Sequence, residues 1–312
     1  MNKKDWKDLR IIFMGTPEFA VASLDKLVTE GGNIVGVITA PDKPGGRGMK
    51  LQQSAVKKYA VEKGLPVLQP EKLKDTIFLH DLKKLEADLQ VVVAFRMLPE
   101  VVWNMPPMGT INVHGSLLPD YRGAAPINWA IINGEKFTGV TTFKLRHQVD
   151  TGNILLSQKI PIDDNITAGG LHEKMKIAGA ELLLTTIQKI ASGTISELEQ
   201  NISIENDRHA PKIFTETCRI NWNEPVGKIY NLIRGLAPVP GAFTMLDNKT
   251  LKILKANKIT ITPGSPVGNP ETDKKSFLRF TASDGYIDVM ELQLEGKKRM
   301  GVTEFLRGYH FQ

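Results

Sequence analysis

A chain of 312 residues, 41% of them apolar and 24% charged, has the composition of a globular protein large enough for two domains. No apolar run approaches the ~20 residues of a membrane span, and the first residues lack the apolar core of a signal peptide. We therefore expect a cytoplasmic protein with no membrane segment. The single cysteine, Cys218, excludes an internal disulfide, and no Cys/His spacing indicates a zinc site, so we expect no metal.

Charge is unevenly placed along the chain, whose net charge is +6. Residues 206–312 contain 16 basic and 11 acidic residues, a surplus of five, whereas residues 1–205 contain 24 and 23, a surplus of one. A basic second half fits a polyanionic partner such as a nucleic acid, although many solvated surfaces carry a similar surplus.

The chain opens with a strand, a helix and a second strand. Residues 10–15 are predicted to form the first strand, an amphipathic helix follows to about Glu30, and residues 33–40 form the second strand. This order begins a doubly wound parallel sheet and predicts an α/β fold. The fingerprint G-x-G-x-x-G is missing, because Pro17 takes the place of the second glycine. The sequence therefore argues against dinucleotide binding, and it contains no Walker loop.

Residues 41–51 hold three glycines, two prolines and three cations. By composition this segment could be a mere exposed connection, but long loops inside compact domains are usually functional. We predict a long, mobile, basic loop here.

Further elements of the first half are recognised by short β-branched runs or by helical spacing of apolar residues. The predicted strands cover residues 66–68, 91–95, 109–114, 139–145 and 154–160, and the predicted helices cover residues 54–63, 76–85 and 171–190. A polar stretch over 191–212 then has the composition of a linker. Beyond it, short strands at 252–254, 277–280 and 287–289, framed by helical patterns at 225–234 and 302–307, predict a small β-barrel.

Polar side chains suited to acyl chemistry lie where predicted strands run out into loops. Asn112 and His114 are two residues apart on one strand and so point to the same face, and Asp150 follows the next strand. Ligands bind at this edge of open α/β sheets. An amide, an imidazole and a carboxylate could form an oxyanion site with an acid/base pair. Alternatively, His114 is a structural histidine, Asn112 caps a turn, and Asp150-Thr151-Gly152 is an ordinary turn.

Several motifs recur together in a known order. They are Asn112-Val113-His114-Gly115-Ser116-Leu117-Leu118-Pro119, then Tyr121-Arg122-Gly123-Ala124-Ala125-Pro126-Ile127, then Asp150-Thr151-Gly152. This set resembles the methionyl-tRNA formyltransferase family, within the folate-dependent formyltransferase superfamily. The resemblance implies a Rossmann-like catalytic domain over residues 1–193, a linker over 194–210, and a smaller OB-like tRNA-binding domain over 211–312.

The resemblance also implies the reaction, in which the formyl group of 10-formyltetrahydrofolate passes to the α-amino group of methionyl-initiator tRNA. Asn112 and His114 would donate hydrogen bonds to the developing oxyanion, and Asp150 would orient His114 and help to move a proton. The folate would lie in an apolar slot formed by Phe95, Met97 and Leu98, closed by Ser116, Leu117, Leu118 and Pro119. We expect a monomer whose partners are the folate and the tRNA.

The same resemblance gives tRNA contacts to the basic loop, with Arg47 touching the acceptor end and Lys43 and Lys50 assisting. In the second domain the candidates for a basic face are Lys297, Lys298 and Arg299, together with Arg219, Lys252, Lys255 and Lys258. One departure from the family pattern precedes Asp150, where His147 and Gln148 could alter the local polarity.

Four rival functions remain open from the sequence. A related formyltransferase could act on a small amine, and a hydrolase of formyltetrahydrofolate could use the same three groups. A hydrolase built on Ser116, His114 and Asp150 is a third possibility, although the G-x-S-x-G elbow is absent. The fourth is an RNA-binding protein whose α/β half is inert, although no RNA-recognition signature is present.

Overall fold

The computed structural model describes residues 5–45, 50–200 and 208–311. By their packing the residues of the chain divide into two compact units. The first unit comprises Met1–Arg122, Gly139–Ile160 and His172–His209, and the second comprises Gly123–Thr138, Pro161–Leu171 and Ala210–Gln312. Two segments from the middle of the chain therefore pack with the C-terminal third.

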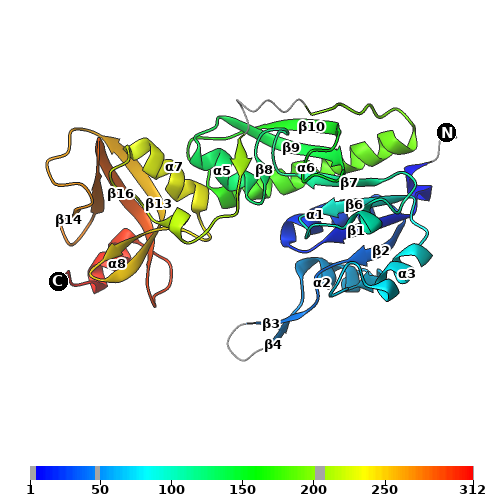
Figure 1. Ribbon diagram of the computed structural model, residues 1–312. Coiled ribbons are helices and arrows are strands. Elements are labelled where there is room, and N and C mark those ends of the chain that lie inside the picture. Colours follow the sequence, from blue (N-terminus) through cyan, green and yellow to red (C-terminus); the bar gives the residue numbers. More distant parts are fainter. Residues whose placement is uncertain (1–4, 46–49, 201–207, 312) are drawn as a thin grey trace. The chain divides into compact units, whose positions relative to one another are not determined.

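The first unit is built on a seven-stranded sheet in the order β10-β9-β7-β6-β1-β2-β5 (Figure 1). Its strands are β1 (Ile11–Gly15), β2 (Ile34–Ile38), β5 (Val67–Leu68), β6 (Leu89–Val93), β7 (Thr110–His114), β9 (Phe137–Lys144) and β10 (Ile154–Pro161). Five neighbouring strands, β5, β2, β1, β6 and β7, are parallel, and β9 is antiparallel to β7. The predicted Rossmann-like α/β fold is confirmed.

Helices cover both faces of this sheet. They are α1 (Glu18–Thr29), α2 (Ala55–Glu62), α3 (Thr76–Lys84), α4 (Glu100–Trp103) and the long α6 (Ala168–Ala191). A 3-10 turn (Trp6–Asp8) precedes β1. Side chains cap two of the helices: the Ser54 hydroxyl accepts a hydrogen bond from the Lys57 amide, and the Asp75 carboxylate accepts from the amides of Ile77 and Phe78. These caps explain why α2 and α3 begin where the sequence predicts.

Two short strands pair as a hairpin in the segment 41–51, for which the sequence predicts a long, mobile, basic loop. Strands β3 (Lys43–Gly45) and β4 (Lys50–Gln52) pair antiparallel, and Figure 1 shows the hairpin extending away from the parallel sheet. At its base the Lys57 ammonium lies 2.5 Å from an oxygen of Asp42, whose other oxygen accepts from the Gln69 amide at 2.8 Å. The Lys57 hydrogen bond, followed by that of Gln69, holds the pKa of the Asp42 carboxyl below its usual value. The base of the hairpin is thus tied to α2 and to the end of β5.

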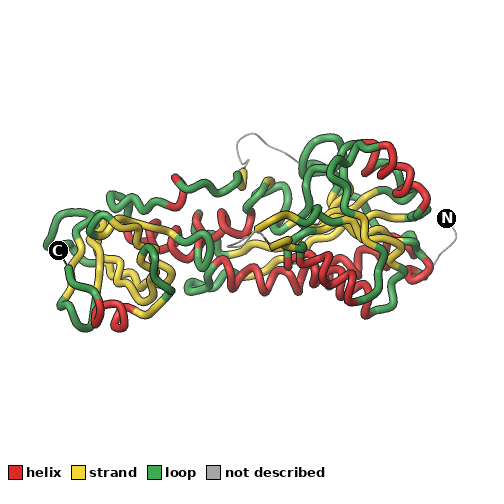
Figure 2. Tube along the Cα trace, turned by 90° about the horizontal axis from the view of Figure 1, so that it is seen from below, coloured by secondary structure: helices red, strands yellow, loops and turns green. Residues whose placement is uncertain are grey.

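The second unit contains an antiparallel sheet in the order β12-β13-β16-β15-β14, with β17 paired to β16. The strands are β12 (Ala242–Leu246), β13 (Lys249–Thr260), β14 (Pro270–Thr272), β15 (Leu278–Ala282), β16 (Gly285–Leu294) and β17 (Met300–Gly301). Figure 2 shows these strands, in yellow near the C-terminus, curling around one another. Helices α7 (Val226–Leu236) and α8 (Val302–Gly308) accompany them. The predicted smaller, barrel-like C-terminal fold is confirmed.

Segments from the middle of the chain complete the second unit. Helix α5 (Pro126–Ile132) packs against α7, where the Asn128 side chain donates to the carbonyl of Gly235 at 2.7 Å. A Cβ on Gly235 would lie 2.6 Å from a side-chain carbon of Ile132, so glycine permits this close approach. The Tyr230 hydroxyl donates to Asn165 at 2.9 Å.

Cys218 lies in the core of the second unit, at the end of a 3-10 turn (Glu216–Cys218). Its thiol donates to the Phe214 carbonyl at 3.3 Å, and burial raises the pKa of the thiol. Two short strands, β8 (Arg122–Gly123) and β11 (His209–Ala210), form a small ladder of their own. Among the helices that the structure describes, none is both long and apolar enough to cross a bilayer.

Candidate active site

Asn112 and His114 stand on one face of β7, at the carboxyl end of the strand. Asn112 pairs with Val92 on one side and with Phe143 on the other, and all three share this face. Val113 points to the opposite face, where it packs against Gly179 of α6. The two-residue period of the strand therefore brings the amide and the imidazole together, as the sequence predicts.

The His114 ring is buried, with a hydrogen bond at one nitrogen and a carboxylate facing the other. Its Nε2 lies 2.9 Å from the carbonyl oxygen of Tyr121, and its Nδ1 lies 3.9 Å from Oδ2 of Asp150. A carbonyl oxygen can only accept, so Nε2 carries a proton and donates it. Nδ1 is therefore the nitrogen that faces the carboxylate. The edge of Phe143 packs near the ring, with centroids 6.5 Å apart.

Asp150 reaches this position from the loop between β9 and β10. The residue is only 9% exposed, and its backbone is left-handed, with φ +54°. Gly152 follows at a point where a Cβ would lie 1.6 Å from the carbonyl oxygen of Lys144, so only glycine fits. His147 and Gln148 lie exposed in the same loop, and Gln148 contributes a backbone carbonyl to the Thr151 hydroxyl.

The Asn112 carboxamide is the uncommitted polar group of the cluster. Its side chain is half-buried, and within the described part of the chain its amide makes no hydrogen bond. An amide N–H held on a rigid strand without a partner can donate to a substrate oxygen without first breaking another bond. The arrangement thus offers one free hydrogen-bond donor beside an imidazole–carboxylate pair.

The loop from Gly115 to Tyr121 folds over the end of β7 and is held by its own polar groups. The Ser116 hydroxyl donates to the Asp120 carbonyl at 2.6 Å. The Thr141 hydroxyl donates to the Ser116 carbonyl at 2.7 Å and accepts from the Leu118 amide at 3.2 Å. Ser116 is thereby engaged within the loop, so its hydroxyl is not poised as a nucleophile.

The apolar residues of this loop have different surroundings. Leu117 packs against Gly139 of β9, where a Cβ would lie 2.4 Å from its side chain. Leu118 is buried, Pro119 is half-buried, and the peptide bond between them is cis. Tyr121, at the end of the loop, has a left-handed backbone with φ +59°.

The three residues predicted for the pterin slot follow β6 and are placed differently from one another. Leu98 is buried in the core beneath α3 and α4, among Phe78 and Val102. Phe95 is half-buried against the same core, whereas the Met97 side chain is 77% exposed. Phe95 and Met97 are therefore accessible to a ligand, and Leu98 supports them from below.

The predicted tRNA contacts are placed in part. Arg47 lies outside the described residues, Lys43 is exposed on β3, and Lys50 begins β4. On the turn between β16 and β17, Lys297 and Lys298 are exposed, while Arg299 donates to Glu291 through its Nε at 2.7 Å. Of the further candidates, Arg219, Lys255 and Lys258 are exposed, and Lys252 donates to the Pro240 carbonyl at 2.8 Å.

Three groups that shape the cluster escaped sequence reasoning: the Tyr121 carbonyl, the Thr141 hydroxyl and the Gln200 side chain. Gln200 donates to the carbonyls of Asp150 and Gly152 at 2.9 and 2.8 Å. A backbone carbonyl has no sequence signature, and the threonine and glutamine carry no motif. Only the fold reveals that the Tyr121 carbonyl contacts His114, that Gln200 contacts the Asp150 turn, and that Thr141 holds the loop from Gly115 to Tyr121.

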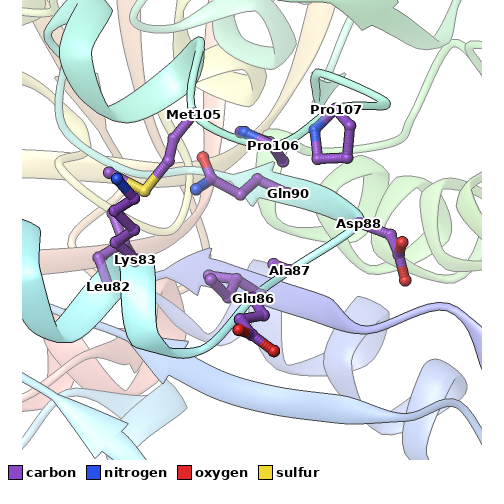
Figure 3. A pocket seen from close by; sticks show the side chains of 10 residues that line it. Leu82, Lys83, Glu86, Ala87, Asp88, Gln90, Met105, Pro106 and Pro107 are labelled. Carbon is purple, nitrogen blue, oxygen red and sulfur yellow. The ribbon is translucent and has the colours of Figure 1, made fainter.

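A cavity of about 290 Å³ lies elsewhere in the first unit, near the amino end of β6 (Figure 3). Gln90 lines it, and in Figure 3 its carboxamide points toward Met105. His114 is the last residue of β7, so the polar cluster lies at the carboxyl ends of the parallel strands and the cavity lies at their amino ends. Among the described residues, no group of three or more His, Cys, Asp or Glu side chains is arranged to hold a metal ion.

Comparison with known proteins identifies the family. Residues 9–187 match the formyl transferase family and residues 212–310 match the formyl transferase C-terminal domain. The methionyl-tRNA formyltransferase of Bacteroides thetaiotaomicron is 52% identical over 310 residues, covering 97% of this chain and 96% of the relative. That of Parabacteroides distasonis is 54% identical over 312 residues, with the same coverage.

A solved structure shares the fold at lower identity. WlaRD, a sugar 3N-formyl transferase crystallised in the presence of dTDP and 5-N-formyl-THF, matches with a TM-score of 0.68 and 21% identity, covering 93% of this chain and 99% of that chain. With two family matches and full-length relatives at more than half identity, the chain belongs to the methionyl-tRNA formyltransferase family.

Proposed function

We propose that this chain transfers the formyl group of 10-formyltetrahydrofolate to the α-amino group of methionine carried by the initiator tRNA. The observation that carries the proposal is the free Asn112 carboxamide beside the buried His114–Asp150 pair, in a chain 52% identical to a methionyl-tRNA formyltransferase. This arrangement suits an acyl transfer in which an oxyanion forms and a proton moves from the attacking amine to the leaving nitrogen.

Asn112 stabilises the charge that develops on the formyl oxygen. When the amine attacks, the carbonyl oxygen becomes an alkoxide, and a preorganised amide N–H gains strength as that charge grows. The residue sits on a strand paired on both sides, so its donor does not need to reorganise during the reaction. The formyl donor supplies the electrophilic carbon, and the chain supplies the hydrogen bond.

His114 and Asp150 handle the proton. Because Nε2 is committed to the Tyr121 carbonyl, Nδ1 and the Asp150 carboxylate are the basic atoms that face one another. A proton leaving the amine can be held between them and returned to the folate nitrogen as the carbon–nitrogen bond breaks. A protonated imidazole would also place positive charge near the oxyanion, stabilised by the neighbouring carboxylate.

For the folate we propose a slot between two segments: Phe95, Met97 and Leu98 after β6, and the loop of Ser116, Leu117, Leu118 and Pro119. Leu98 and Ser116 act by support, since the first is buried in the core and the second hydrogen-bonds within its loop. The solved structure of WlaRD with 5-N-formyl-THF supports a folate donor for this fold.

For the tRNA we propose contacts from Lys43, Arg47 and Lys50 of the hairpin and from Lys297, Lys298 and Arg299 of the β16–β17 turn. Within this proposal, residues 1–193 carry the chemistry, residues 194–210 link, and residues 211–312 bind tRNA. We further propose that the protein acts as a cytoplasmic monomer.

The decisive experiment is a formylation assay with a labelled formyl donor and three acceptors: methionyl-initiator tRNA, methionyl-elongator tRNA and free methionine. We expect rapid transfer to the first and little to the others. Transfer to free methionine or to another small amine at a comparable rate would overturn the tRNA assignment. Release of formate without any acceptor would indicate a hydrolase instead.

A salt series tests the basic residues separately. Replacing Arg47, or Lys297 and Lys298 together, by alanine should weaken tRNA binding and flatten its salt dependence, because fewer counterions are released on binding. Lys84→Ala is the matched control, since Lys84 is exposed like Lys297 and Lys298 but lies at the end of α3. If the variants and the control bind tRNA alike, the basic residues are merely solvated.

A further inference from the structure

The two residues that face the nitrogens of the His114 ring both have a left-handed backbone conformation. Asp150, facing Nδ1, has φ +54°, and Tyr121, whose carbonyl accepts from Nε2, has φ +59°. Left-handed conformations are unfavourable for residues other than glycine and persist only where their surroundings hold them. The surroundings that hold these two residues come from one distant stretch of chain.

Gln200 holds the Asp150 turn directly. Its Nε2 donates to the Asp150 carbonyl at 2.9 Å and to the Gly152 carbonyl at 2.8 Å. The opposite orientation of the amide would set its oxygen against two carbonyl oxygens, so chemistry fixes Nε2 as the atom that faces them. One side chain therefore spans the turn and ties both of its ends.

The residues just before Gln200 fasten the strands on either side of the turn. Glu197 accepts from Lys144 of β9 at 2.5 Å and from Asn153 before β10 at 3.0 Å. Leu198 and Ile154 exchange two backbone hydrogen bonds, of 2.8 and 2.9 Å. Residues 197–200 thus contact the Asp150 loop at its start, its centre and its end.

Arg208 provides the corresponding contact for Tyr121, the residue whose carbonyl accepts from His114. Its carbonyl accepts from the Tyr121 amide at 2.6 Å. Glu197, Leu198, Gln200 and Arg208 together are called the brace below. All four belong to the stretch whose composition predicts a linker.

We propose that the brace is part of the catalytic machinery, and that Gln200 is a positioning residue that holds the Asp150 carboxylate opposite Nδ1 of His114. This rests on the proposed function, because it assigns a role in the proton transfer of that reaction. The Gln200 amide is engaged by two backbone carbonyls of the Asp150 turn, so we expect it to affect the rate of the chemical step rather than the binding of folate or tRNA.

The test compares Gln200→Ala and Gln200→Glu with Glu199→Ala, a matched control at an exposed neighbour. We expect Gln200→Ala to lower kcat about 10- to 100-fold, the scale of a small misplacement of catalytic groups, with both KM values changed less than about threefold. Glu199→Ala should equal the wild type. A Gln200→Ala variant that is folded and retains kcat within about twofold of wild type overturns the proposal.

Gln200→Glu separates positioning from packing, because the two side chains have the same size. An ionised carboxylate repels the two carbonyls, whereas the protonated form can donate one hydrogen bond. The ratio of the Gln200→Glu rate to the wild-type rate should therefore rise as the pH is lowered from 8 to 6, although both rates decline. A ratio that stays constant with pH contradicts the donor role, even if Gln200→Ala fails to fold.

A measurement independent of activity distinguishes this proposal from the proposed function. Amide hydrogen exchange in peptides covering residues 145–153 should be about tenfold faster in Gln200→Ala, with exchange in β1 and β6 unchanged. Unchanged exchange in that loop overturns the brace whatever the reaction. Wild-type protein that forms no formyl-methionyl-tRNA while the loop still loosens overturns the proposed function alone.

Discussion

Two loops bring polar groups to His114, and they are held in opposite ways. The loop 115–121 is fastened by its own Ser116 and by Thr141 of the adjacent strand. The loop 145–153 is fastened by Glu197 and Gln200, which lie about fifty residues further along the chain. The first loop is held largely by its own groups and by the adjacent strand, with one bond from the Tyr121 amide to the distant Arg208 carbonyl. The second is held by side chains that only the complete fold brings to it.

This difference predicts how each loop responds to substitution. The first loop has hydrogen bonds both from its own Ser116 and from Thr141, so a single change leaves some of them in place. In the second loop Gln200 bonds both ends of the turn that presents the Asp150 carboxylate, so a change at Gln200 alters the position of that carboxylate. Substitutions at five positions, in decreasing order of expected effect, break or sharpen the contrast.

Asp150→Asn replaces the carboxylate that the second loop places opposite His114. We expect turnover to fall by about 10²–10⁴-fold, the usual contribution of a general acid or base, because the amide cannot accept the proton. Affinity for tRNA should stay within about threefold, since the carboxylate is buried beside His114. Single-turnover formylation and tRNA binding measured on the same preparation check this. Loss of binding with intact chemistry at saturating tRNA would make Asp150 a substrate contact.

Asn112→Ala and His114→Ala remove the groups that both loops surround. Asn112→Ala should lower kcat by about 10²–10³-fold, the loss typical of an oxyanion donor. His114→Ala should lower it by about 10²–10⁴-fold, the usual contribution of a group that moves a proton. Asn112→Ala should leave the unfolding midpoint nearly unchanged, since the carboxamide has no partner among the described residues. The measurements are single-turnover rates and thermal melts followed by circular dichroism. A folded Asn112→Ala variant with near-normal turnover would count against the oxyanion role, and a folded His114→Ala variant with near-normal turnover would count against the proton-transfer role.

Thr141→Val tests the first loop. It keeps the shape of the side chain but strands the Leu118 amide and the Ser116 carbonyl, both of which Thr141 now satisfies. We expect a loss of about 1–3 kcal/mol in the free energy of unfolding, the cost of buried groups left unpaired. Thr141→Ser keeps the hydroxyl and should lose only about 1 kcal/mol for the missing methyl group. Equal losses in urea unfolding would mean that the hydroxyl does not hold the loop.

Glu197→Gln has the smallest expected effect and a defined pH dependence. The Lys144 hydrogen bond lowers the pKa of Glu197, so this contribution is present above the ordinary glutamate pKa of about 4.3 and is lost as the pH falls through the lowered value. The Lys144 and Glu197 side chains are each about one-third exposed, so we expect the free energy of unfolding to fall by about 0–1 kcal/mol at pH 7. Urea unfolding of wild type and variant should converge below about pH 4. A difference that grows in acid would contradict this account.

Much of the fold could be read from local patterns. The β-branched runs predict β6 and β7, and helical spacing predicts α2, α3 and α6. In the structure Ser54 and Asp75 cap the first two of these helices. The common face of Asn112 and His114 follows from strand geometry alone. These features depend on residues close together in sequence, so the sequence contains them in full.

What could not be read depends on tertiary contacts. The sequence does not reveal that Leu98 packs among Phe78 and Val102, because that contact depends on α3 and α4 closing over that face. The sequence predicts a long, mobile, basic loop over residues 41–51 and does not reveal that β3 and β4 pair there despite Pro44 and Gly45. The close packing of α5 on α7 depends on the absence of a side chain at Gly235, and no sequence motif indicates this role.

The buried thiol of Cys218 gives the chain a practical property. It is the sole cysteine, it lies in a closed core, and burial raises its pKa, so little of the reactive thiolate is present at neutral pH. The native chain should therefore react slowly with maleimides. A second cysteine introduced at an exposed position such as Ile177 would react first and alone. Fluorophores can thus be attached at one chosen point without first removing Cys218, which keeps the core of the second unit intact while binding is followed by fluorescence.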